Sequence, residues 1–286
     1  MMHFVEAKGL LSAQNGMNIY RGCTHGCIYC DSRSHCYQMK HDFEDIEVKQ
    51  NAPQLLLQAL RAKRTKCMIG TGAMSDPYMP CEKDLALTRQ CLEIIEQNGF
   101  GLAIQTKSDL ILRDLDLLKQ IHKNAKCVVQ MTLTTFDESL CQVLEPNVCT
   151  TKRRYEVLQI LRENGIPTVV WLSPLLPFIN DTEENMRGIL DDCRKAEVYG
   201  ILCFGIGLTL REGNREYFYA ALDRHFAGLS DVYHQKYGLA YQVGSDRSDY
   251  LMGLFYQFCK EYGIVADIGA IFQYLRTLPD RQLKLF

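Results

Sequence analysis

The feature that most constrains the fold of this 286-residue sequence is an alternation of short apolar runs with longer amphipathic runs. The short runs have the length of buried strands, and the longer runs carry apolar side chains at helical spacing and often end at glycine. The predicted strands cover 17–22, 66–72, 100–106, 127–135, 167–176 and 201–208, and the predicted helices 53–63, 82–99, 108–124, 151–165 and 182–200. About six such units predict an α/β fold with a parallel sheet, as either a partial barrel or an open doubly wound sheet.

The same pattern bears on the domain organisation. No linker rich in Gly, Pro or Ser divides the chain, and no short-period repeat accompanies the alternation. We therefore expect residues 1–225 to form one core domain. Residues 226–286 carry helical, polar-aromatic sequence and are predicted to form a C-terminal helical extension packed on the open side or end of that core.

The composition argues against several classes of protein. The chain has 47% hydrophobic and 23% charged residues and a formal net charge of −2, so it lacks the basic excess of a dedicated nucleic-acid binder. Its N-terminal stretch, MMHFVEAKGLLSAQNGMN, has no basic segment followed by an apolar core, and no apolar run reaches the length of a membrane span. We therefore expect a cytoplasmic protein without a membrane partner.

Three of the thirteen cysteines are closely spaced, while the others are too scattered for a disulfide scaffold. Cys23, Cys27 and Cys30 lie in the stretch RGCTHGCIYC, separated by gaps of three and two residues. Three thiolates from one loop can hold three corners of a cubane 4Fe–4S cluster. Gly22 and Gly26 give the backbone the freedom to wrap around a bulky group.

Zinc is the competing metal for this loop. Structural zinc prefers four ligands, usually in two separated pairs, and His25, His35 or Cys36 can complete such a set around the three thiols. A chain of that kind would be a zinc-binding or iron–sulfur protein without catalysis. A loop of three unliganded cysteines is the remaining alternative.

The CxxxCxxC spacing, with the aromatic Tyr29 directly before the third cysteine, resembles the signature of radical S-adenosylmethionine (SAM) enzymes. The resemblance implies a partial (β/α)6 TIM-like barrel, which selects between the two architectures left open above. It also implies that Cys23, Cys27 and Cys30 hold a 4Fe–4S cluster whose open iron binds SAM, with Tyr29 in the cofactor site. One electron from an external flavodoxin- or ferredoxin-type donor then cleaves SAM, and the resulting 5′-deoxyadenosyl radical abstracts hydrogen from a substrate.

Four stretches are similar to one branch of this family, the spore photoproduct lyases and their relatives. They are NIYRGCTHGCIYC, SDPYMPCEKDLALTRQ, IQTKSDLILRDLDLL and WLSPLLPFIND, and they span about residues 17–210. Residues of that branch that contact SAM match Ser75, Lys107 and Thr132, at the carboxyl ends of strands where barrel sites lie. Lys107 can pair with the SAM carboxylate, and the two hydroxyls can bind its polar groups. The alternatives are a solvated lysine, a turn-forming serine and a plain strand-forming threonine.

Two departures argue against the reaction of the lyase itself. The lyase has a hydrogen-donating cysteine directly before the binding serine, where this chain has Met74, whose thioether carries no S–H. Cys81 is a weaker substitute on the same loop, and Asp31 replaces the aromatic residue that follows the third cysteine. We therefore expect a radical SAM enzyme that acts on an unidentified substrate. The branch suggests a nucleic-acid lesion, and a peptide or small metabolite is the alternative.

Three further features have mainly structural interpretations. Trp171 and Phe204 are predicted to pack in the core, although a barrel interior can offer either ring to an adenine. Asp76 is expected either to cap the helix that starts near Glu82 or to accept hydrogen bonds from a substrate or ribose. The basic run TKRRY, at 151–155, is predicted to form a solvated helix face.

Overall fold

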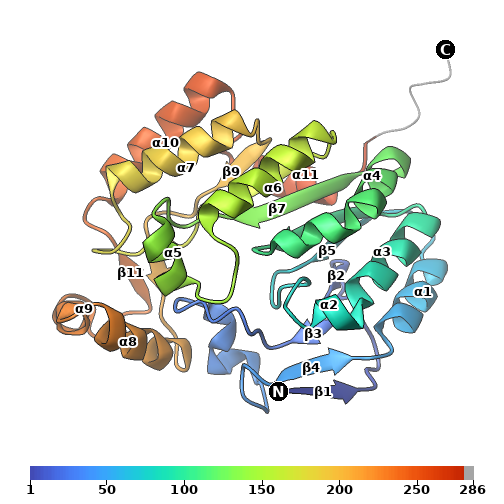
Figure 1. The fold of residues 1–286 in the computed structure, drawn as a ribbon, viewed down its shortest axis with the longest axis horizontal. Coiled ribbons are helices and arrows are strands. Elements are labelled where there is room, and N and C mark those ends of the chain that lie inside the picture. The colour runs from blue at the N-terminus through green and yellow to red at the C-terminus, as the bar shows by residue number, and fades with distance from the viewer. Residues whose placement is uncertain (280–286) are drawn as a thin grey trace.

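The centre of the fold is a parallel sheet of six strands, seen in a computed structural model that describes residues 1–279 (Figure 1). The strands run in the order β2 (Gly16–Met17), β5 (Met68–Thr71), β6 (Gly101–Thr106), β7 (Cys127–Thr132), β8 (Thr168–Trp171) and β9 (Gly200–Leu202). Each neighbouring pair is parallel, and β2 and β9 form the two edges of an open sheet. The parallel α/β sheet predicted from the strand–helix alternation is confirmed, and it has the form of the partial barrel that the resemblance implies.

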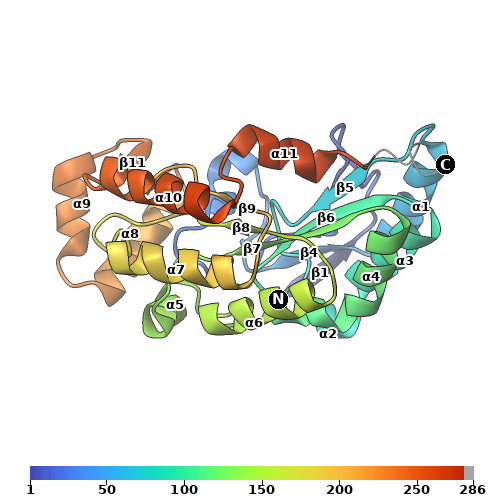
Figure 2. The ribbon, with the colours of Figure 1, turned by 90° about the horizontal axis from the view of Figure 1, so that it is seen from above.

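Amphipathic helices cover one face of this sheet. They are α1 (Ala52–Ala62), α2 (Glu82–Leu85), α3 (Leu87–Gln97), α4 (Leu115–Asn124), α5 (Glu138–Leu144), α6 (Thr151–Glu163) and α7 (Glu183–Lys195). Figure 2 shows α4, α6 and α7 on one side of the sheet and α11 (Ile268–Arg276) on the other. The helix predicted over 82–99 is interrupted, because Ala86 takes a left-handed conformation with φ 48° between α2 and α3.

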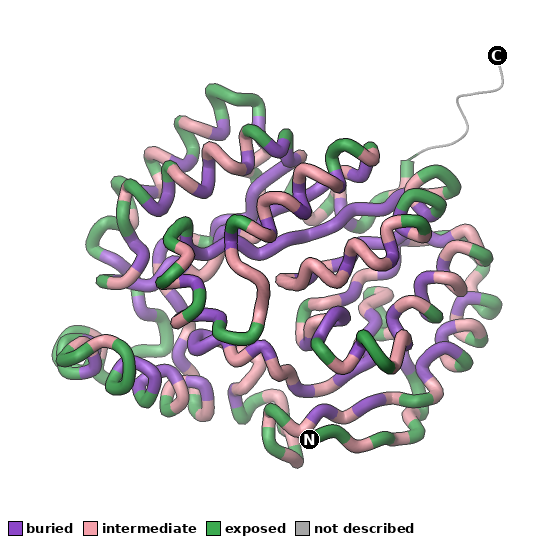
Figure 3. Tube along the Cα trace, viewed as in Figure 1, coloured by how far each residue is buried: buried purple, intermediate pink, exposed green. Residues whose placement is uncertain are grey.

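The strands that were predicted best are those buried on both faces. All six residues of β7 are buried, which fits the continuous apolar run expected of a central parallel strand (Figure 3). Two predicted strands are instead divided. The segment 17–22 contributes to β2 and to β3 (Tyr20–Arg21) of a different sheet, and 201–208 contributes to β9 and to β10 (Gly207–Thr209).

A small second sheet, with strands before and after the cysteine-rich loop, was not predicted. Its order is β1 (Met2–Val5), β4 (Ile46–Lys49) and β3, with β1 and β4 parallel and β3 antiparallel to β4. The chain passes directly from the end of β3 into the loop that carries the three cysteines. This sheet therefore sets the position at which that loop begins.

The C-terminal segment packs on the core at several places, and its last helix covers the inner face of the main sheet. It contains α8 (Asn214–His225), α9 (Leu229–Tyr237), β11 (Gln242–Gly244), α10 (Ser248–Tyr262) and α11, and β11 pairs antiparallel with β10. Ile271 and Leu275 of α11 belong to one buried cluster with Met68, Val128 and Val169 of the sheet. The domain division at residue 225 stays a prediction, and the last residues of the predicted extension, 280–286, lie outside the described part of the chain.

No helix in the described part of the chain combines the length and the apolar character that a membrane-spanning helix needs.

Candidate functional site

The loop from residue 22 to residue 30 is shaped by two glycines in the left-handed region. Gly22 has φ +90°, and a Cβ there would lie 2.5 Å from the carbonyl oxygen of Phe43. Gly26 has φ +72°, and its Cβ would lie 3.0 Å from Pro146 Cγ. The Cys23 amide also donates to the Phe43 carbonyl at 2.9 Å. Glycine is therefore required at both bends, and the loop is held against its neighbours by backbone contacts.

The three thiols of this loop are free, with Cys27 buried and Cys23 and Cys30 half-buried. Within residues 1–279, their sulfur atoms are not gathered within 4.8 Å of one another. Thiolates around one tetrahedral zinc ion lie about 3.8 Å apart, because each Zn–S bond is about 2.3 Å long. In an iron–sulfur cluster, by contrast, each cysteine binds a different iron atom, so the ligand sulfurs lie further apart.

Burial keeps two of these thiols protonated in the protein alone. Burial, followed by the charge of the Asp76 carboxylate, raises the pKa of the Cys23 thiol to about 12. Burial likewise raises the pKa of Cys27 well above its usual value. A thiolate ligand set therefore needs the positive charge of a metal group to displace these protons. The donor set of three buried or half-buried thiols fits an iron–sulfur group of that kind.

The buried ion pair of Glu145 and Arg154 contacts the cysteine loop through Tyr29. The Tyr29 hydroxyl donates to the Glu145 carboxylate, which also accepts a hydrogen bond from the guanidinium of Arg154. Arg154 donates in addition to the carbonyl oxygens of Thr132 at 2.8 Å and Cys149 at 3.0 Å. The network therefore ties the third-cysteine end of the loop to the end of β7.

The charges in this network stabilise one another. Burial alone raises the pKa of the Glu145 carboxyl, but Arg154 and Lys107, together with the hydrogen bonds it accepts, hold that pKa below its usual value. Burial and the Glu145 charge raise the pKa of the Tyr29 hydroxyl, so it remains a donor. The sequence did not predict a role for Glu145. The prediction that the basic run 151–155 is solvated is wrong for Arg154, which is fully buried.

Asp76 joins the loop after β5 to the end of β6. Its carboxylate accepts from the Tyr78 amide at 2.8 Å, the Thr106 hydroxyl at 2.7 Å and the Lys107 amide at 2.8 Å. His25 of the cysteine loop lies 3.5 Å from the same carboxylate. The prediction that Asp76 caps the helix starting near Glu82 is wrong, because the N-cap of α2 is Cys81. The role of Asp76 as an acceptor from a substrate or ribose stays a prediction.

The structure places each predicted SAM-binding residue at the carboxyl edge of the sheet. Ser75 is buried in the loop after β5, Lys107 is half-buried directly after β6, and Thr132 is buried as the last residue of β7. Over the described residues, Lys107 Nζ has no hydrogen-bond acceptor, and it lies 6.0 Å from the centre of the Tyr29 ring. The strand ends therefore bring an uncommitted cation close to the cysteine loop.

An aromatic group lies on the same face of the sheet as Thr132. Trp171 is the register partner of Thr132 on β8, and paired residues of parallel strands project to one face. The ring centroid of Phe204 lies 5.6 Å from Trp171 and 6.3 Å from Phe272 of α11. Phe204 is 51% exposed, so the prediction that it packs in the core is wrong. Trp171 is half-buried, and its Nε1 donates to Gln130 at 2.9 Å.

The residue that replaces the lyase cysteine does not lie deep in the protein. Met74 is half-buried in the loop after β5, next to the buried Ser75. Cys81 lines a separate pocket of about 400 Å³ together with Met1 and Asn147. Burial raises the pKa of the Cys81 thiol to about 11. A role for Cys81 as hydrogen donor stays a prediction.

The fold and the three-thiol loop define a class of protein, and sequence comparison identifies it. Residues 17–192 match the family model of the Radical SAM superfamily, which covers more than half of the chain. The chain therefore belongs to the radical SAM superfamily, as the cysteine spacing predicts.

Several sequence relatives of this chain are named uncharacterized proteins, and one from Pseudomonas phage M6, 24% identical over 59% of this chain and 34% of its own length, is named a radical SAM Nalpha-GlyT isomerase. One from Methanocaldococcus jannaschii is 37% identical over 58% of this chain and 62% of its own length. One from Mycobacterium tuberculosis is 30% identical over 77% of this chain and 66% of its own length. The chain thus spans less than two thirds of the length of these relatives.

A solved structure from the predicted branch has a similar fold. Spore photoproduct lyase complexed with dinucleoside spore photoproduct matches 91% of this chain and 79% of its own, with a TM-score of 0.64 and 14% identity. This likeness concerns the fold, and it agrees with the branch suggested by the four sequence stretches.

Proposed function

We propose that this chain is an enzyme that cleaves SAM reductively at a 4Fe–4S cluster held by Cys23, Cys27 and Cys30. The observation that carries the proposal is the loop itself. Three free thiols, at the spacing typical of radical SAM enzymes, lie on a glycine-bent loop that packs against the carboxyl edge of a radical SAM sheet. When bound, such a cluster supplies one electron to the sulfonium of SAM and so generates the radical that takes hydrogen from a substrate.

The residues of the chain would bind and orient SAM. Lys107 offers a cation with no partner among the described side chains, which suits the carboxylate of SAM. Ser75 offers a hydroxyl in the loop after β5, and Thr132 offers one at the end of β7. These two strands lie on either side of β6. Tyr29 acts through Glu145, since its hydroxyl is committed to that carboxylate and fixes the loop rather than the ligand. An external donor of the flavodoxin or ferredoxin type would supply the electron.

Anaerobic reconstitution of the full chain tests this function. We expect iron and sulfide in equal amounts, a broad visible absorption that fades on reduction with dithionite, and release of 5′-deoxyadenosine from SAM. The alternative of a structural protein predicts stoichiometric, colourless zinc and no cleavage of SAM. Recovery of zinc without iron under these conditions would contradict the proposal.

Replacing Lys107 by alanine should weaken the binding of SAM while leaving the iron content unchanged. The lost charge-assisted contact is worth about 1.5–3 kcal/mol, which corresponds to a roughly ten- to hundredfold higher Kd. Equilibrium dialysis of SAM against the reconstituted chain measures this. Lys119→Ala is the matched control, because that lysine lies on α4 and bonds only Asn164. Equal affinities for the two variants would refute the role of Lys107.

For the substrate, we infer a planar group derived from a nucleic acid. Phe204, Trp171 and Phe272 offer a partly exposed aromatic surface on the inner face of the sheet, and bases stack on such surfaces. The fold also resembles a lyase solved with a dinucleoside spore photoproduct. Met74 nevertheless removes the thiol through which the lyase completes its reaction, so we expect a different lesion or modified nucleoside.

Isotope transfer distinguishes the substrate classes. Deuterium should appear in 5′-deoxyadenosine when the reconstituted chain is given deuterated nucleic acid, and the transfer should fall when Phe204 is replaced by alanine. Transfer from labelled peptides or small metabolites alone would point to those substrates instead. The net charge of −2 supplies no general attraction to phosphates, so recognition would rest on the base.

A further inference from the structure

A second set of metal-ligand side chains lies in the small N-terminal sheet. His3 of β1 and His41 and Asp45 of the following loop have ligand atoms within 4.8 Å of one another, the sole such trio in the described part of the chain. Glu47 of β4 is the register partner of His3, and its carboxylate lies 3.8 Å from His41 Nε2. Three candidate ligands therefore converge, and Glu47, which faces His41 but does not lie within 4.8 Å of all three, is a fourth candidate beside them.

Their separations are close to those around one ion. His3 Nδ1 lies 3.1 Å from Asp45 Oδ2, and His41 Nε2 lies 3.8 Å from Glu47 Oε2. Nitrogen and oxygen ligands about 2.0 Å from a tetrahedral zinc ion are about 3.3 Å from each other. Two imidazoles and two carboxylates are also a ligand set that zinc accepts.

The hydrogen bonds of His41 determine which nitrogen can bind a metal. Its Nδ1 lies 3.0 Å from the carbonyl oxygen of Asp42, which can only accept, so Nδ1 carries the ring proton. In the neutral ring Nε2 then has a lone pair, and this buried atom finds no hydrogen-bond partner among the described groups. Nε2 and the facing Glu47 carboxylate are both electron-pair donors, so a cation between them relieves their repulsion.

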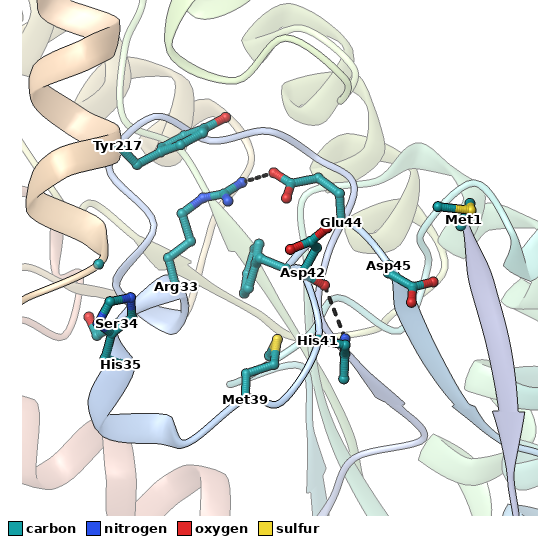
Figure 4. A pocket seen from close by; sticks show the side chains of 12 residues that line it. Met1, Arg33, Ser34, His35, Met39, His41, Asp42, Glu44, Asp45 and Tyr217 are labelled. Carbon is teal, nitrogen blue, oxygen red and sulfur yellow. Dashed lines mark hydrogen bonds and ion pairs between the residues drawn. The ribbon is translucent and has the colours of Figure 1, made fainter.

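A cavity provides access to this group of residues. Its volume is about 460 Å³, and its wall includes His41, Asp42, Glu44 and Asp45 (Figure 4). The Arg33 guanidinium in the same wall is paired with Glu44 and packs on the Tyr217 ring. The carboxylates of Asp42 and Asp45 also face this cavity, as does Met1 at the N-terminus.

We propose that His3, His41, Asp45 and Glu47 form a zinc site that is separate from the cysteine loop. An ion there would fasten β1 and the loop 41–45 to β4. Phe43 lies within this loop, and its carbonyl accepts the Cys23 amide at 2.9 Å. The zinc ion would therefore hold the segment against which the first cysteine of the cluster loop is positioned, and its role is structural.

The test uses the full chain with Cys23, Cys27 and Cys30 replaced by serine, which removes metal binding at the cysteine loop. After incubation with zinc and dialysis, mass spectrometry should find about one zinc ion per chain. Cobalt(II) in its place should give visible d–d bands without thiolate charge transfer. His3→Ala and His41→Ala in this background should weaken zinc binding by about tenfold or more. His35→Ala is the matched control, because His35 lines the same cavity outside the proposed ligand set.

Folding is checked separately by the zinc-free melting temperature and circular dichroism of each variant. If an alanine variant does not fold, Asp45→Asn and Glu47→Gln give the same readout with side chains of unchanged size. The proposal is overturned if the serine background retains no zinc, if zinc affinity survives loss of both histidines, or if cobalt shows a thiolate band.

Discussion

Replacing Cys30 by alanine in the reconstituted chain is expected to lower the yield of 5′-deoxyadenosine from SAM about a thousandfold or more, to the level of the background reaction. The reason is that the loop supplies three thiols, and removal of one leaves the cluster with too few protein ligands. The iron content should fall in the same variant. Quantitation of the nucleoside by liquid chromatography, together with an iron assay, measures both effects.

Cys36→Ala is the matched control for this prediction. Cys36 is an exposed thiol six positions further along the same segment, and its sulfur contacts the Arg211 guanidinium at 3.3 Å. We expect this variant to keep both the iron and the cleavage of SAM. The reverse pattern, with a harmless Cys30→Ala and an inactive Cys36→Ala, would show that the metal ligands have been assigned to the wrong thiols.

The central strands could be predicted from sequence because burial on both faces leaves a continuous apolar run. β7 is the example, with every residue buried. The strands β1 and β4 could not be predicted in this way, because each has four residues with alternating exposure at the margin of the fold. β2 and β3 are two-residue pairings, and they depend on partners at Gly70 and Val48 that only the tertiary structure supplies.

The cysteine loop could be predicted from a short stretch of sequence, whereas the buried ion pair that stabilises it could not. The three cysteines and the two glycines lie within one stretch of ten residues, so the proposed ligands could be chosen from the sequence alone. Arg154 is different, although its spacing from Val157, Leu158 and Leu161 places it on the buried face of α6. That periodicity could have predicted its burial. Its partner Glu145 follows a separate helix, so the ion pair itself requires the folded arrangement.

Arg154→Ala should destabilise the chain by about 3–5 kcal/mol, because it leaves the carboxylate of Glu145 buried without its counterion. The substitution also removes the donors to the carbonyl oxygens of Thr132 and Cys149. A loss of this size is a large part of the stability of about 5–15 kcal/mol that is typical of globular domains. Urea unfolding of the metal-free chain measures the free energy of unfolding. The slope of this free energy against urea concentration shows whether the unfolding transition is otherwise unchanged.

The neighbouring Arg153 supplies the control for Arg154. It lies on the same helix but its side chain is 40% exposed, with ion pairs to Asp109 and Glu156, so Arg153→Ala should change the free energy of unfolding by less than about 1 kcal/mol. Replacing the buried pair as a unit, with Arg154→Met, Glu145→Leu and Tyr29→Phe, should recover much of the loss, because no charge or hydroxyl remains unpaired. Similar destabilisation by Arg153→Ala and Arg154→Ala would show that the buried network does not support the cysteine loop, since burial and pairing are what distinguish the two arginines.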